Sequence, residues 1–284
     1  MVSFSEAANR HGTDKGTLAG AAHGYSVVYD LLFAPYQSRR ALDVLEIGLA
    51  IGGPELGGDV DRCVAGAPSL GMWFDCLDDP KIVGFDISDF KQFENDRFTF
   101  IRGDSGRTDD LKRVHELGRQ FDIILDDGSH ASFHQQVAMG SLFHLLKPGG
   151  LYVIEDLSWQ PAEIESDLPG VPRTAKLLTD FVQSSRFEAN DALDQDAARR
   201  LEEMISGVFL YDESELNSLA ANYNARQGLP SIDRRGWRGR SGIARMSHAH
   251  FWLFAARRFM AAVQGSEFAT WQAVKLAILQ RRPE

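Results

Sequence analysis

Acidic residues end each of five short apolar segments of the chain. Glu46, Asp86 and Asp104 stand at the ends of the first three segments, and the pairs Asp126–Asp127 and Glu155–Asp156 end the last two. Short apolar runs are typical of buried parallel strands, whose carboxyl ends share the edge of a sheet where ligands bind. We therefore expect the five acidic positions to converge on one site.

Three of these acids have the chemistry of metal ligands. Asp127 and Asp156 lie about one strand–helix–strand unit apart, so adjacent parallel strands would bring Asp127, Glu155 and Asp156 together. Carboxylate oxygens are the ligands that Mg²⁺ prefers, and this ion keeps positions open for water or substrate. Two neighbouring hydroxyl groups of a sugar could fill two of those positions.

A glycine turn and two further acids indicate a nucleoside. Gly48 lies in the turn LEIGLAIGG, where glycine allows a ligand to approach the backbone closely. Asp86 could accept hydrogen bonds from both ribose hydroxyls, and Asp104 ends the next strand. Together they suit an adenosine-containing cofactor. The spacing is not G-x-G-x-x-G, so a dinucleotide is not specifically indicated, and the turn alone is also compatible with a purely structural role.

The elements that would position these residues alternate along the chain. We expect strands within residues 42–50, 82–88, 98–104, 121–129 and 149–157, and helices within 25–36, 108–120 and 134–150. This alternation predicts parallel βαβ units in an open α/β sheet. Beyond residue 157 we expect helices within 175–185 and 197–206 and strands within 207–212 and 273–281, and the type of the apolar run 248–263 stays open.

These elements suggest how the chain is organised. Residues 1–40 are expected to form an N-terminal helical cap or lid segment. Residues 41–284 are expected to form the catalytic domain, with an elaboration on the acceptor side from about residue 158.

Three motifs carry a family resemblance. The order Glu-x-Gly, Asp, Gly-Asp and Asp-Asp resembles the class I S-adenosylmethionine-dependent methyltransferases. GTDKG (12–16), DDGSH (126–130) and PGGLYVIEDL (148–157) are similar to motifs of the metal-dependent sugar O-methyltransferases of antibiotic and macrolide tailoring, the mycinamicin-type group, and of the related cephalosporin-tailoring enzymes. The resemblance covers about residues 10–157. The chain departs from it at Ala50 and in the stretch 54–70.

The resemblance implies a Rossmann-like fold, S-adenosylmethionine and Mg²⁺ as cofactors, and specific roles. Its matching acids make Asp127, Glu155 and Asp156 the metal ligands, and its matching histidine makes His130 the general base. Together with the strand-end analysis, it gives as cofactor-binding residues Glu46, Gly48, Asp86, Asp104, Asp126, Lys15 and Tyr25.

The function expected is methyl transfer to a hydroxyl of a sugar or glycosylated natural product in antibiotic biosynthesis. Trp159, Tyr211, Tyr223 and Trp237 could stack on a sugar, or could be ordinary core and surface residues. Two alternatives are an NAD-dependent oxidoreductase on a Rossmann-like fold and a non-catalytic S-adenosylmethionine-binding module. The missing dinucleotide fingerprint disfavours the first, and the acid–histidine set disfavours the second.

Composition limits the partners. The net charge of −10 argues against nucleic acid and anionic membranes as partners. No apolar run reaches the ~20 residues that span a bilayer. No signal peptide is visible in the sequence. Cys63 and Cys76 are the only cysteines and are both expected as reduced thiols, so we predict a cytoplasmic protein. We separately expect a homo-oligomer. The arginine-rich loop 233–245 could clamp an anionic substrate or lie in solvent. His248 and His250 could bind a metal, but surface or core positions are the commoner case.

Overall fold

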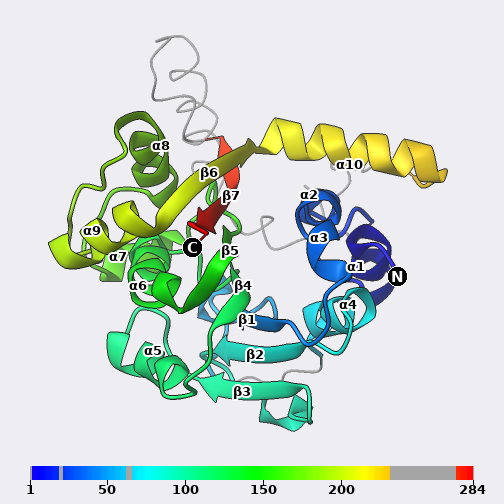
Figure 1. Ribbon diagram of the computed structural model, residues 1–284, viewed down its shortest axis with the longest axis horizontal. Helices are drawn as coiled ribbons and strands as arrows, with labels where there is room; N and C mark the ends of the chain where they lie inside the picture. The colour runs from blue at the N-terminus through cyan, green and yellow to red at the C-terminus, as the bar shows by residue number, and fades with distance from the viewer. Residues whose placement is uncertain (1, 19–21, 62–65, 231–272, 284) are drawn as a thin grey trace.

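A mixed sheet of seven strands organises residues 2–18, 22–61, 66–230 and 273–283, the parts of the chain that the computed structural model describes (Figure 1). Its strands are β1 (Asp43–Ile47), β2 (Lys81–Asp86), β3 (Phe98–Arg102), β4 (Phe121–Asp126), β5 (Leu146–Ile154), β6 (Ile205–Asp212) and β7 (Val274–Arg281). The order across the sheet is β3-β2-β1-β4-β5-β7-β6. Strands β1 to β5 run parallel, and β7 lies antiparallel between β5 and β6.

Helices cover both faces of this sheet. On one side lie α1 (Phe4–His11), α2 (Tyr25–Leu32), α3 (Ala34–Gln37), α4 (Pro68–Cys76) and α10 (Glu213–Gln227). On the other lie α5 (Thr108–His115), α6 (Ser132–Leu142), α8 (Thr174–Ser184) and α9 (Gln195–Met204). Shorter pieces connect them: α7 (Ala162–Asp167) and the 3₁₀ turns η1 (Pro54–Leu56), η2 (Lys91–Phe93) and η3 (Phe143–Leu145).

Both faces of the strands are buried, which explains their continuous apolar runs. In β4, Ile123 and Leu125 pack with the helices of the first side, whereas Ile124 packs with those of the second. The same alternation holds in β1, where Val44 and Leu45 belong to opposite cores. A strand covered on both sides needs apolar residues at every position, so only its end is left for polar chemistry.

The expected fold class is confirmed: the sheet is that of an open α/β protein, and every expected strand has a counterpart. Two details differ. The helix expected over 25–36 divides into α2 and α3, since Pro35 lies in the first turn of the second helix. The last strand, β7, inserts antiparallel beside β5. The boundary at residue 40 stays a prediction.

Some expectations fall on residues outside the described ranges. They are Cys63, the arginine-rich loop 233–245, Trp237, the run 248–263 and the histidines His248 and His250. None of the helices within the described ranges combines the length and apolar character needed to cross a membrane.

Candidate functional site

The carboxyl ends of β1, β4 and β5 meet at one edge of the sheet. The backbone N–H of Asp127 donates to the carbonyl of Ile47 at 2.8 Å, and that of Glu155 donates to the carbonyl of Asp126 at 3.0 Å. These bonds continue the strand pairing by one residue. They place Asp127, Glu155 and Asp156, which we call the acidic cluster, side by side as the sequence predicts.

Asp127, Asp156 and His130 form a group that can hold a cation. One ligand atom of each lies within 4.8 Å of the others. His130 and Asp156 both have left-handed backbone conformations, with φ of 62° and 52°. Such values are uncommon for residues other than glycine and often mark functional sites. Nδ1 of His130 is buried and has no hydrogen-bond partner in the part of the chain that the structure describes. The ring lies 5.3 Å from that of Trp159.

Glu155 lies in the cluster but is bound by other groups. Lys15 Nζ donates to its Oε2 at 3.0 Å, and the hydroxyl of Tyr29 donates to its Oε1. The same ammonium donates to Oδ2 of Asp127 and lies 3.9 Å from Oε1 of Glu46. Both oxygens of Glu155 are therefore in use, and Lys15 joins the ends of β4 and β5.

Negative charge exceeds positive charge around this lysine. Burial opposes the charge of Lys15, but the carboxylates of Asp127 and Glu155 outweigh it and raise its pKa well above the ordinary value. Burial and the charge of Asp127 in turn raise the pKa of Glu155 well above its usual range. One ammonium cannot neutralise all the carboxylates that surround it, so either a proton or a further cation can balance the remaining charge.

Asp156 has a different set of partners. The hydroxyl of Tyr25 donates to its Oδ1 at 2.9 Å, Lys275 Nζ lies 3.7 Å from the same oxygen, and His23 Nε2 lies 3.8 Å from Oδ2. Burial would raise the pKa of Asp156, but His23 and Lys275 outweigh it and hold the pKa well below its usual range. Asp156 is thus a carboxylate at neutral pH.

The glycine turn packs directly against the DDGSH loop (126–130). Gly48 has φ of 80°, and a Cβ there would lie 2.0 Å from the carbonyl oxygen of Asp127. The next residue, Leu49, donates its N–H to Oδ2 of Asp86 at 2.8 Å, and Ser88 donates to Oδ1 at 2.7 Å. Asp86 is therefore fixed beside the turn, as a ribose-binding acid would have to be.

The remaining predicted cofactor residues lie around this turn. Burial raises the pKa of Glu46 to about 7, and its Oε2 accepts from Ser69 and from Trp73, each at 3.0 Å. Burial likewise raises the pKa of Asp126 to about 7, and Tyr152 donates to it.

Asp104 accepts from the N–H of Gly106 at 2.8 Å and lies 3.9 Å from His134. His134 in turn shares a 2.6 Å hydrogen bond with Ser129 in the DDGSH loop. The end of β3 is thereby connected to the loop that carries His130.

Three residues that contact the acids are not among those predicted from the sequence: His23, Tyr29 and Lys275. Tyr29 follows Tyr25 by one helical turn, so both tyrosines lie on one face of α2, and this spacing was a usable signal. His23 and Lys275 have no comparable signal in the sequence. Lys275 Nζ donates to His23 Nδ1 at 2.5 Å, a contact between residues 252 positions apart.

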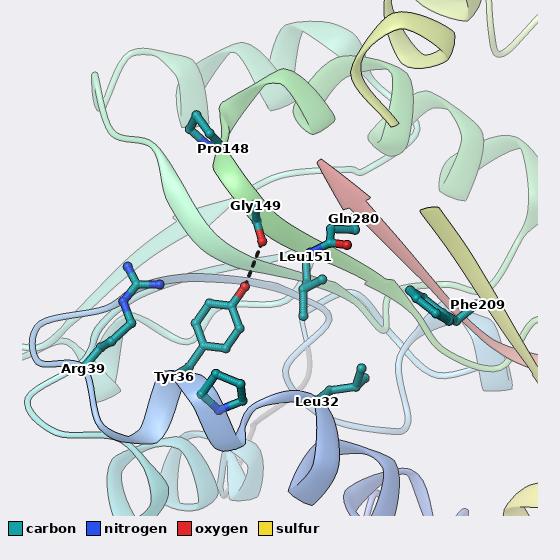
Figure 2. A pocket seen from close by; sticks show the side chains of 9 residues that line it. Leu32, Tyr36, Arg39, Pro148, Gly149, Leu151, Phe209 and Gln280 are labelled. Carbon is teal, nitrogen blue, oxygen red and sulfur yellow. Dashed lines mark hydrogen bonds between the residues drawn. The ribbon is translucent and has the colours of Figure 1, made fainter. Parts of the chain in front are cut away.

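An apolar groove lies away from these residues. It is lined by Leu32, Pro35, Tyr36, Arg39, Pro148, Gly149, Leu151, Phe209 and Gln280 (Figure 2). The hydroxyl of Tyr36 donates across it to the carbonyl of Gly149 at 3.0 Å. Gly149 belongs to the amino-terminal half of β5, whereas the acids follow the carboxyl end of that strand, so the groove and the acidic cluster are separate.

The donor set fits a divalent cation. Asp127 and Asp156 offer hard carboxylate oxygens, and His130 adds a buried nitrogen that no group among the described residues satisfies. The fit rests on side chains from the ends of two adjacent strands. Glu155, the third expected ligand, is not in the group of three, and its two oxygens accept from Lys15 and Tyr29.

Comparison with known proteins gives relatives of one kind. The chain is 37% identical over 155 residues to 8-demethyl-8-alpha-L-rhamnosyl tetracenomycin-C 2'-O-methyltransferase of Streptomyces olivaceus, which covers 54% of this chain and 38% of that protein. It is 36% identical over 157 residues to mycinamicin VI 2''-O-methyltransferase of Micromonospora griseorubida, covering 54% of this chain and 36% of the relative. No protein-family model matches the chain.

A solved structure agrees with these relatives. MycE methyltransferase from the mycinamycin biosynthetic pathway, in complex with Mg, SAH and mycinamycin VI, matches with a TM-score of 0.56 and 28% identity over 74% of this chain and 52% of that one. The chain thus spans about half of MycE and little more than a third of the curated relatives. It is homologous to sugar O-methyltransferases of antibiotic tailoring over about half of its length, and it has the Rossmann-like fold of the class I methyltransferases.

Proposed function

We propose that the protein is an S-adenosylmethionine- and Mg²⁺-dependent O-methyltransferase that methylates a sugar hydroxyl of a glycosylated natural product. The observation that carries this proposal is the group Asp127, His130 and Asp156, set beside the glycine turn and Asp86. The relatives support it, since both are named as O-methyltransferases and one is named for a rhamnosyl compound.

The cofactor would lie along the glycine turn. Asp86 would accept from the ribose hydroxyls, and Gly48 would allow the close approach. Glu46, Asp104 and Asp126 remain proposed cofactor-side residues. Lys15 and Tyr25, expected at the cofactor, contact the acidic cluster instead, so we assign them to that side of the site.

Asp127 and Asp156 would hold the metal ion, with Glu155 as a further ligand once its oxygens are released. When bound, the ion would supply Lewis-acid polarisation of the acceptor hydroxyl. S-adenosylmethionine, when bound, would supply the methyl group and leave as S-adenosylhomocysteine. The imidazole of His130 would accept the proton of the acceptor hydroxyl. Trp159, which is 40% exposed beside His130, offers its ring as a surface for the apolar face of the sugar.

We propose further that the enzyme is cytoplasmic, forms a homo-oligomer and acts on a free small molecule. The excess of acidic over basic residues disfavours nucleic acid and anionic membranes as partners. An NAD-dependent oxidoreductase is disfavoured by the relatives and by the missing dinucleotide fingerprint.

An acceptor panel tests the proposal. The full chain is incubated with labelled S-adenosylmethionine, Mg²⁺ and rhamnosides, other deoxysugar glycosides, catechols or amines. We expect transfer to a glycoside that stops in excess EDTA and returns with Mg²⁺. Transfer to catechol alone would overturn the sugar assignment, and full activity without metal, checked by elemental analysis, would overturn the metal assignment.

The His130→Ala variant tests the base. We expect kcat to fall by about 10²–10⁴-fold while affinity for S-adenosylhomocysteine stays near that of the wild type, because His130 would act only on the acceptor proton. His144→Ala, a change in η3 remote from the acids, is the matched control. Wild-type kcat in His130→Ala would show that His130 is structural.

A further inference from the structure

Lys15 lies between Asp127 and Glu155, two of the acids expected as metal ligands. Its side chain is 3% exposed, and its ammonium donates to one oxygen of Asp127 and one of Glu155. Tyr29 holds the other oxygen of Glu155. Glu155 can therefore become a metal ligand only if one of these donors withdraws.

The lysine is the donor that can withdraw without a change in the fold. Its carbonyl accepts from the N–H of Ser26 at 2.9 Å, which ties the backbone at residue 15 to the start of α2. Its side chain has four flexible carbons beyond Cα, whereas the ring of Tyr29 is fully buried among aromatic neighbours such as Phe4 and Phe33. Rotation about the side-chain bonds of Lys15 is enough to free Glu155 and an oxygen of Asp127.

We propose that Lys15 is a built-in counterion: it neutralises Asp127 and Glu155 in the metal-free protein and is displaced from them by the divalent cation. The inference rests on the metal site of the proposed function. Glu155 becomes available as a ligand only when the ion displaces Lys15. In this exchange, one doubly charged ion replaces one singly charged ammonium among buried carboxylates.

The second buried lysine of the site provides a matched control. Lys275 is 5% exposed and carries the same charge, but it approaches only Asp156, at 3.7 Å, and donates to His23. Removing it takes away one positive charge near the acids and leaves both contacts of Glu155 in place. A difference in metal affinity between the Lys15 and Lys275 variants therefore reports displacement of Lys15, and not merely the loss of one positive charge.

The first test measures Mn²⁺ binding by electron paramagnetic resonance of the free ion, on the wild-type protein, Lys15→Met and Lys275→Met. We expect Lys15→Met to bind Mn²⁺ on the order of tenfold more tightly than the wild type, because the ion no longer competes with an ammonium. Lys275→Met should gain clearly less affinity for Mn²⁺. Should Lys15→Met fail to fold, Lys15→Gln, which keeps a hydrogen-bond donor, is measured in its place.

The second test uses the wild-type protein alone. Acylation of amines, followed by mass spectrometry, should find Lys15 protected without metal and more reactive at saturating Mn²⁺, while Lys275 is unchanged. Unchanged protection of Lys15, or equal gains in affinity for the two lysine variants, would overturn the exchange. A wild-type protein that binds no Mn²⁺ would overturn the metal site itself, and the exchange with it.

Discussion

At the scale of single residues, the site depends on carboxyl groups removed from water. Glu46 is fully buried, accepts from Ser69 and Trp73, and has one oxygen without a hydrogen bond. Lys15 Nζ lies 3.9 Å from this carboxyl and favours its charged form, but burial outweighs that effect and favours the neutral form. Glu46 should therefore make the stability of the protein depend on pH.

Replacing Glu46 by Gln tests this dependence. Burial raises the pKa of Glu46 from 4.5 to about 7, so between these values the unfolded chain loses a proton that the folded chain keeps. The stability that Glu46 contributes is complete below pH 4.5 and is lost as the pH rises through 7. Relative to the wild type, Glu46→Gln should gain about 2–3 kcal/mol in free energy of unfolding over this window.

Urea denaturation at several pH values between 4 and 8 measures the effect. The exposed Glu116→Gln is the control and should give a difference from the wild type that does not vary with pH. A flat difference for Glu46→Gln as well would show that Glu46 is ionised in the folded protein throughout this range.

At the scale of elements, the contact between the β1 turn and the β4 loop fixes the site. Gly48 combines a positive φ with a space that the backbone of Asp127 fills. We expect Gly48→Ala to cost about 3 kcal/mol or more, since the chain must relieve both the conformational strain and a clash with backbone. Gly118→Ala has a similar φ of 61° and no atom within 4 Å of the added Cβ, so it should cost only about 1 kcal/mol.

Thermal unfolding and Mn²⁺ binding measure the two glycine variants. Gly48→Ala should lower both stability and metal affinity, because Asp127 must move. Equal stability losses in the two variants would mean that the loop at Asp127 moves to accept the added methyl group without a loss of stability.

The sequence predicts the parallel part of the sheet well because each strand is a short apolar run that ends in acid. It predicts Asp127 and Asp156 for the same reason. It does not predict that β7 inserts beside β5, since an apolar run carries no information on the direction of pairing. His23 and Lys275 escape prediction because single residues on remote segments meet only through that pairing.

At the scale of the whole molecule, a metal ion would join the carboxyl ends of β4 and β5. A ligand that binds only the folded state stabilises it by about 2.7 kcal/mol at a hundred times its dissociation constant. We therefore expect saturating Mg²⁺ to raise the Tm by about 5–10 °C and EDTA to reverse the rise. Scanning calorimetry measures the shift.

Asp156→Asn should lose most of this shift, because it removes one ligand charge while an amide oxygen can still accept from Tyr25. Asp180→Asn, an exposed change in α8, should keep it. A shift of equal size in Asp156→Asn would mean that the ion binds elsewhere.

The pair of His23 and Lys275 also has a consequence for synthesis on the ribosome. The acids at the ends of β4 and β5 are made early, but the lysine that accompanies Asp156 is added only after residue 274. Strand β7 must then enter the sheet between β5 and the already translated β6. A nascent chain therefore carries an incomplete site until β7 has been translated, and closure of this long-range contact should follow the pairing of the parallel strands.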